Sequence, residues 1–156
     1  MSDWQKNTRM RTASRPSFAV RADSSSSSPL EITVLHTNAQ NTVKSLQNVA
    51  RLAQDLSADI RLLVLQVVPY PLPLEMPDVP LEFTSQNLLE TISPLEVDVR
   101  VDIRLGRDQD AMLESAFPPA SLVMVGRRYR WWPSSENRIA RLLRRRGHQV
   151  ISTDSE

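Results

Sequence analysis

The sequence of 156 residues contains no cysteine and only two histidines, His36 and His148. The absence of cysteine excludes disulfides, thiolate metal sites and cysteine nucleophiles. Two histidines give a zinc centre almost no ligands, so we expect no metal. No serine or carboxylate accompanies either histidine in the pattern of a catalytic triad, and we therefore expect that the protein is not an enzyme.

Long apolar runs are also missing. No stretch approaches the roughly 18 apolar residues of a membrane span, and the N-terminus lacks the apolar segment of a secretory signal. A hydrophobic content of 40% in a chain of this length is enough for one buried core. We expect a soluble, cytoplasmic protein that has no membrane partner.

The charges are unevenly distributed, although the formal net charge is only +1. Residues 127–146 contain eight arginines and a single acidic residue, whereas residues 75–114 contain ten acidic residues and three arginines. Separation of this kind can orient an anion or a second subunit, and it also occurs on surfaces that only face solvent.

Residues 1–29 differ in composition from the rest of the chain. They have no amphipathic period, carry more basic than acidic residues, and end in the serine run Ser24–Ser28 before Pro29. This composition predicts a disordered tail over 1–29 and one domain over 30–156. An organellar transit peptide, or upstream sequence from a misplaced start, would have a similar composition.

Apolar patterns over the remaining chain alternate between strand and helix. The predicted strands are 31–37, 61–68, 97–105, 121–125 and 149–152. Helical spacing covers 43–56, after a polar turn whose last residue, Asn41, is a good cap, and 81–92, with Phe83, Leu88, Leu89 and Ile92 as its apolar positions. A third helix begins at Asp108 or Gln109, and a fourth follows Ser134 or Ser135. The sequence predicts an α/β fold, an open, doubly wound, five-stranded parallel sheet with helices on both faces.

Two segments suggest contacts with other molecules. Strict alternation of apolar and charged residues over 97–105 predicts one buried and one wet face, as in an edge strand or a strand near a subunit contact. Five prolines within Pro69–Pro80 predict an extended loop, which would wrap the edge of a site or a protein partner.

The stretch 121–147 carries the candidate binding residues. An apolar strand is followed by a tight exit at Gly126 and by a loop that holds Arg127, Arg128 and Arg130. These arginines, the hydroxyls of Ser134 and Ser135 and the start of the next helix can attract an anion, at the edge where open α/β sheets bind ligands. Trp131 and Trp132 in the same loop can stack on a base, but we favour packing against the core or a subunit.

Residues 31–153 resemble the universal stress protein family. The segment Gly106-Arg-Asp-Gln-Asp-Ala-Met112 is similar to the family's Gly-x-Pro-x-x-x-Ile entry to its third helix, and Leu122-Val-Met-Val-Gly126 is similar to its Ile-Val-Met-Gly strand end. The resemblance implies a Rossmann-like fold of the adenine nucleotide alpha hydrolase type. It also implies a homodimer, for which the edges would be the strand 97–105 and the last strand, and ATP binding.

The residues that would hold ATP in this family are changed. Thr37 stands where the family has an acidic residue, Tyr129 replaces the second loop glycine, and Pro133-Ser134-Ser135 replaces Gly-Ser. A ring at Tyr129 fills space that backbone amides need to approach phosphate. We therefore expect a non-catalytic, dimeric regulatory or binding module that has lost or altered its nucleotide site and needs no cofactor.

Two alternatives stay open. The first is a functional ATP or nucleotide binder that uses Thr37, Gly126, Arg127, Ser134 and Ser135. The second is binding of a nucleic acid or another polyanion by arginines such as those at 144–146, although no recognised nucleic-acid motif accompanies them.

Overall fold

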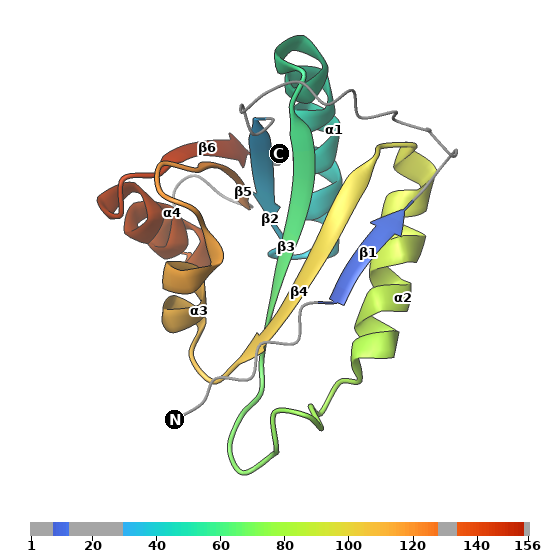
Figure 1. Cartoon of the computed structure of the whole chain (residues 1–156), viewed down its shortest axis with the longest axis vertical. Coiled ribbons are helices and arrows are strands. Elements are labelled where there is room, and N and C mark those ends of the chain that lie inside the picture. The colour runs from blue at the N-terminus through green and yellow to red at the C-terminus, as the bar shows by residue number, and fades with distance from the viewer. Residues whose placement is uncertain (1–7, 13–29, 128–133, 155–156) are drawn as a thin grey trace, which may run out of the picture.

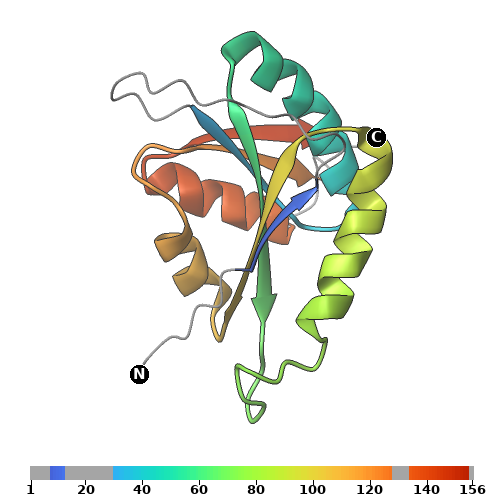
Figure 2. The ribbon, with the colours of Figure 1, turned by 45° about the vertical axis from the view of Figure 1, so that its right-hand side comes forward.

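A computed structural model describes residues 8–12, 30–127 and 134–154, in which a mixed sheet is covered by helices on both faces (Figures 1 and 2). In chain order the elements are β1 (Thr8–Thr12), β2 (Glu31–Leu35), α1 (Ala39–Leu56), β3 (Asp59–Val67), α2 (Leu81–Ile92), the 3-10 turn η1 (Ser93–Leu95), β4 (Val99–Gly106), α3 (Gln109–Ala116), β5 (Leu122–Arg127), α4 (Ser135–Arg145) and β6 (Gln149–Asp154).

The strand order in the sheet is β1-β4-β3-β2-β5-β6. Strands β2 to β6 run parallel to their neighbours, which confirms the five-stranded parallel sheet expected from the sequence. Helices α1 and α2 lie on one face, and α3 and α4 lie on the other (Figures 1 and 2). The chain leaves β2 toward β3 and β4, and it later returns to the other side of β2 to form β5 and β6.

The two faces of the sheet bury separate apolar clusters, and alternation along β2 shows how. Ile32 and Val34 point to the face that α1 and α2 cover, where they pack with Leu46 and Leu88. Leu35 points to the opposite face, where the apolar residues of α3 and α4 pack. Hydrophobic residues on both sides of one strand are expected for a parallel sheet with helices on each face.

Helix starts follow the sequence signals closely, with one correction. The N-cap of α1 is Asn38, whose side chain accepts a hydrogen bond from the backbone N–H of Asn41 at 2.9 Å. Asn41 itself is therefore inside the helix and is not its cap. Asp108 caps α3 and Ser134 caps α4, as the sequence predicts.

Helix α2 buries a narrower stripe than its sequence predicts. Ser85, Leu88 and Ile92 face the core at intervals of three and four residues. Phe83 falls outside this stripe and is 58% exposed, so its assignment as a core position is wrong. The proline segment before α2 contains neither helix nor strand, which confirms the expected loop.

Strand β1 comes from the segment that the sequence predicts to be a disordered tail. Thr8–Thr12 pairs antiparallel with β4, with Thr8 opposite Ile103 and Thr12 opposite Val99. The prediction is wrong for these five residues, because an extended segment can satisfy the unpaired backbone groups along the outer side of β4. Residues 1–7 and 13–29 lie outside the described part of the chain.

Strand β4 is therefore not an edge strand, and most of its charged face is shielded from solvent. It lies between β3 and β1 in the sheet. Asp102, at the centre of that charged face, is only 6% exposed because arginines from β3 and β4 surround it. The alternation correctly predicts a strand with one polar face, but ion pairs cover most of that face, and among its charged residues Arg100, whose side chain is 37% exposed, has the largest exposure.

Candidate functional site

The candidate site lies where β2 and β5 end side by side. The chain adds β3 and β4 on one side of β2, and it later adds β5 and β6 on the other side, so the order of the strands reverses at β2. Open α/β sheets bind ligands at the carboxyl edge next to such a reversal. Thr37, which follows β2, and Gly126, near the end of β5, are therefore placed at the same edge, as the sequence predicts.

Asn41 joins these two predicted residues, and sequence reasoning missed its role. Its side-chain amide donates to Thr37 Oγ1 and to the backbone oxygen of Gly126, both at 3.4 Å. Asn41 is buried, in the first turn of α1. Asn41 stands three residues after Asn38, the residue that caps the helix. The sequence prediction took Asn41 itself as the cap, and its contacts with the strand ends were therefore missed.

Gly126 is needed because α1 approaches β5 closely. A Cβ atom at this position would lie 2.8 Å from Asn41 Cβ and 2.9 Å from Ser45 Oγ. The chain makes no tight turn here, because β5 continues through Arg127, and this part of the prediction is wrong. The glycine serves helix packing against the strand, not a turn.

Arg127 and Ser134 are linked through a third residue, Asn137 in α4. The guanidinium of Arg127 donates from Nη1 to Asn137 Oδ1 at 3.1 Å, and the backbone N–H of Asn137 donates to Ser134 Oγ at 3.3 Å. Ser134 thus caps α4, the side chain of Arg127 reaches the first turn of that helix from the end of β5, and both residues make contacts within the chain. Asn137 was missed, although it stands three residues after the cap, where a polar side chain often contacts the start of a helix.

Ser135, Arg128 and Arg130 complete the predicted set. The hydroxyl of Ser135 is exposed and lies 3.4 Å from the carboxylate of Glu136 in the same helical turn. A carboxylate at this position weakens the attraction of the helix start for an anion. Arg128 and Arg130, with Tyr129, Trp131 and Trp132, lie outside the described residues.

His36 lies directly before Thr37. Its Nδ1 is 2.7 Å from Thr42 Oγ1, and its backbone N–H donates to the Leu63 oxygen at 2.9 Å. Burial lowers the pKa of His36 below its usual value because the protein interior disfavours the charged imidazolium. The ring is therefore neutral at physiological pH.

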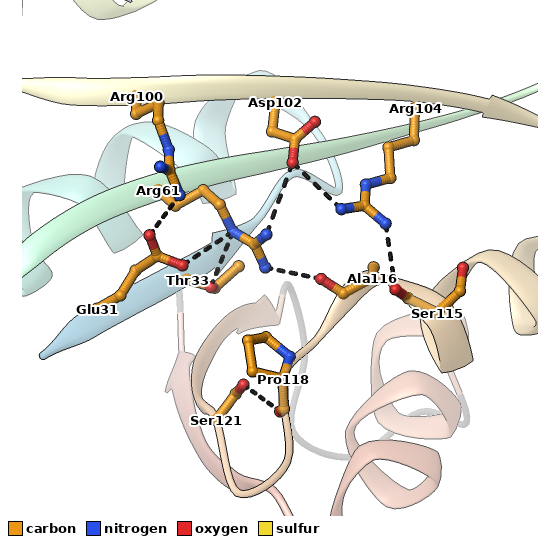
Figure 3. A network of polar contacts seen from close by, with 10 residues as sticks. All are labelled: Glu31, Thr33, Arg61, Arg100, Asp102, Arg104, Ser115, Ala116, Pro118 and Ser121. Carbon is orange, nitrogen blue, oxygen red and sulfur yellow. Dashed lines mark hydrogen bonds and ion pairs between the residues drawn. The ribbon is translucent and has the colours of Figure 1, made fainter. Parts of the chain in front are cut away.

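A second polar group is buried on the face of the sheet covered by α3 and α4, and Figure 3 shows it from close by. At its centre is Arg61 of β3, which is 5% exposed. Its guanidinium lies 3.4 Å from the carboxylate of Glu31 and 3.6 Å from that of Asp102. It also donates to Thr33 Oγ1 at 3.2 Å and to the Ala116 oxygen at 3.0 Å.

Arginines of β4 extend this network. Arg100 pairs with Glu31, and Arg104 lies 3.5 Å from Asp102 while it donates to the Ser115 oxygen at 3.2 Å. Two arginines thus bind carbonyls at the end of α3, where the helix dipole favours positive charge. Burial lowers the pKa of Arg61, and the nearby carboxylates oppose this effect. We assign the network to the attachment of α3, because its arginines contact carboxylates and carbonyls of the chain itself.

Within residues 8–12, 30–127 and 134–154, no group of three or more His, Asp or Glu side chains is placed to hold a metal ion. No helix in the same ranges is long and apolar enough to cross a membrane.

Comparison with known proteins identifies the fold. Neither protein-family models nor curated protein sequences give a match. Among solved structures, a universal stress protein in complex with cAMP has a TM-score of 0.55 and 14% identity, over 83% of this chain and 100% of its own. A universal stress protein from Archaeoglobus fulgidus also has a TM-score of 0.55, with 11% identity over 79% of this chain and 92% of its own.

The chain therefore has the Rossmann-like α/β fold of universal stress proteins. This confirms the fold that the resemblance implied from the sequence segments around Gly106 and Gly126. At this level of identity the comparison concerns the fold, and the chemistry of the site depends on the residues of this chain.

Proposed function

We propose that this protein is a non-catalytic, cytoplasmic regulatory or binding module of universal stress protein type, that it forms homodimers, and that its nucleotide site is altered. The observation that carries the proposal is the hydrogen bonding of Asn41 to Thr37 and Gly126. The amide takes one acceptor position of the Thr37 hydroxyl and one of the Gly126 carbonyl, which lie at the edge where a nucleotide would bind.

The other predicted contacts support the same conclusion. Ser134 uses its hydroxyl to cap α4, and Arg127 donates to Asn137. Thr37 supplies no negative charge where the family resemblance places an acidic residue. An anion that approaches this edge is attracted mainly by the arginines, whose effect is broad and is screened by salt.

The alternative is a nucleotide-binding protein that uses Thr37, Gly126, Arg127, Ser134 and Ser135. One observation favours it, because a protein of similar fold has been solved in complex with cAMP. Such a site would hold its ligand by geometry and would distinguish ATP from smaller anions.

Titration calorimetry separates the two functions. We expect weak binding of ATP, pyrophosphate and sulfate with little discrimination, lost at about 0.3 M salt, and reduced equally by Arg127→Ala and Arg128→Ala. ATP or cAMP binding that survives this salt and is lost in Thr37→Val would overturn the proposal. Gly126 is unsuitable for the test, because a side chain there would displace α1.

The proposed homodimer uses the outer edge of β6. Among the described strands β6 pairs only with β5, whereas β1 covers the outer side of β4. An unpaired strand edge can join its copy across a twofold axis. Sedimentation that shows a strict monomer at tens of micromolar would contradict this part of the proposal.

A further inference from the structure

Exposed apolar side chains gather in one segment of the described chain. Of its seven exposed large hydrophobic residues, five lie within residues 67–83. We call them the proline surface, and they are Val67, Tyr70, Met76, Val79 and Phe83. They belong to the end of β3, the proline segment and the first turn of α2, at the bottom of Figure 1. A concentration of this kind marks an interaction site more often than scattered exposed residues do.

Side-chain contacts fix the backbone under the proline surface. Gln66 donates from Nε2 to the Val79 oxygen at 2.6 Å and accepts at Oε1 from Thr84 at 3.2 Å. Arg107 donates to the Val68 oxygen at 3.0 Å, and its guanidinium lies 4.2 Å from the ring centroid of Tyr70. A surface held in this way needs little ordering when a partner binds.

The charge that the proline segment and the start of α2 contribute is of one sign, and the positive charge at this surface is that of Arg107, which lies on Tyr70. Glu75, Asp78 and Glu82 are exposed within this surface, and residues 62–99 contain no lysine, arginine or histidine. An occupant with positive charge would therefore be attracted, and aromatic faces such as those of Tyr70 and Phe83 also favour cations. The contact between Arg107 and Tyr70 is an example within the chain.

Helix α4 carries the matching charge. The helix contains four exposed arginines and its C-cap, Arg146, is a fifth; Arg138 pairs with Asp110 and Arg146 with Glu114. Arg141 and Arg145, one helical turn apart, are exposed and make no ion pair with any residue in the described ranges. We call these two residues the arginine face. Their long aliphatic stems can pack on apolar groups while the guanidinium groups meet carboxylates.

The two surfaces lie apart, because the proline surface is at the end of β3 and the start of α2, whereas the arginine face is on α4. Helix α2 packs on the cluster that contains Ile32, whereas α4 packs on the cluster that contains Leu35, and both views of the chain show them apart (Figures 1 and 2). They do not meet within one molecule, so complementarity between them acts between copies. We propose that the proline surface of one copy binds the arginine face of a second copy, head to tail.

A head-to-tail contact does not close on itself at two copies, and it extends into chains or rings. It differs from the proposed pairing of β6 edges, and neither contact requires the other. Assembly should grow with protein concentration and weaken with salt, because exposed charges contribute to it.

The test is a pair of charge-reversal variants studied by sedimentation velocity at low salt. One variant is Asp78→Arg/Glu82→Arg, and the other is Arg141→Glu/Arg145→Glu. Each alone should associate at least about tenfold more weakly than the wild type, because like charges meet at the contact. An equimolar mixture of the two variants should restore assembly. The arginines introduced in the first variant then meet the glutamates introduced in the second. The unchanged surfaces of the two variants pair as they do in the wild type.

Asp55→Arg/Asp59→Arg is the matched control. It makes the same change of charge on exposed residues at the opposite edge of the sheet, and it should assemble as the wild type does. A mixture that fails to restore assembly overturns the proposal, as does a wild type that sediments alike at about 0.05 M and 0.5 M salt up to several hundred micromolar. Dimers that persist at high salt in all variants would support only the β6 edge.

Nucleic-acid binding by α4 is the competing outcome. A single-stranded RNA probe that binds the wild type and is lost in Arg141→Glu/Arg145→Glu, with self-association unchanged, would overturn the proposal in favour of that function.

Discussion

The guanidinium of Arg61 lies 3.6 Å from the carboxylate of Asp102, and both side chains are buried where α3 ends against the sheet. Removal of the Arg61 charge leaves Asp102 with Arg104 as its remaining charged partner and takes away the donor to the Ala116 oxygen. Loss of one member of a buried network is costly because the charges that stay are less well compensated.

We therefore expect Arg61→Met to lower the free energy of unfolding by about 3–5 kcal/mol. Arg61→Met/Asp102→Leu should recover little of this loss, because Arg104 then loses its carboxylate partner. Urea unfolding followed by circular dichroism measures both. Arg138→Ala, which breaks an exposed pair with Asp110, is the control and should cost about 0–1 kcal/mol. A cost below about 1 kcal/mol for Arg61→Met would contradict a stabilising role of the network.

Gly126→Ala should destabilise the fold by about 1–3 kcal/mol, because the added Cβ meets Asn41 and Ser45 at under 3 Å. Thermal unfolding is the measurement. A substitution at Gly147 should be destabilising for a different reason. The φ angle of Gly147 is +87°, and no atom lies within 4 Å of an added Cβ. Gly147→Asn should therefore cost less than Gly147→Ala, because asparagine tolerates positive φ. Equal stability of Gly126→Ala and the wild type would show that α1 can move.

Stability should fall as the pH is lowered from about 7 through the unfolded-state pKa of histidine, in part because of His36. Its pKa is lowered by burial in the folded state, whereas in the unfolded state it is about 6.5. The unfolded state therefore binds more protons in this range, so the contribution of His36 is complete above the unfolded pKa and is lost as the pH falls toward the folded pKa. Unfolding at several pH values should show a shallower slope in His36→Asn. An unchanged slope would contradict the assignment.

Deletion of residues 1–29 should weaken β4. The deletion removes β1, which leaves the outer side of Val99–Ile103 without a partner strand. Amide hydrogen exchange should become faster along this strand and stay unchanged in β5. The melting temperature should fall by a few degrees, which corresponds to a loss of about 1 kcal/mol in the free energy of unfolding. Unchanged exchange in β4 would show that β1 does not protect it.

The alternation of strands and helices was predictable because parallel strands and amphipathic helices leave different apolar periods. Caps such as Asp108 and Ser134 could be read directly, since one hydroxyl or carboxylate near a helix start has a local role. The pairing of β1 with β4 could not, because backbone hydrogen bonds between distant segments leave almost no trace in side-chain pattern.

For the candidate site, the sequence found the loop positions but not the contacts that hold them. Thr37, Gly126, Arg127 and Ser134 lie at the predicted edge. Asn41 and Asn137, which bind them, are ordinary polar residues of helices when read from the sequence. The buried ion pair of Arg61 could have been predicted from the sequence. One charge at the start of an apolar strand requires a partner, and the charged face of β4 supplies it.

The position of β1 also sets an order of events during synthesis. Thr8 leaves the ribosome 95 residues (103 − 8) before Ile103, its partner across the sheet. The first βαβ unit, β2 to β3, can form long before that pairing, since its residues are close in the sequence. The N-terminal strand therefore has no partner in the sheet until β4 has been synthesised, whereas β2 and β3 can pair before then.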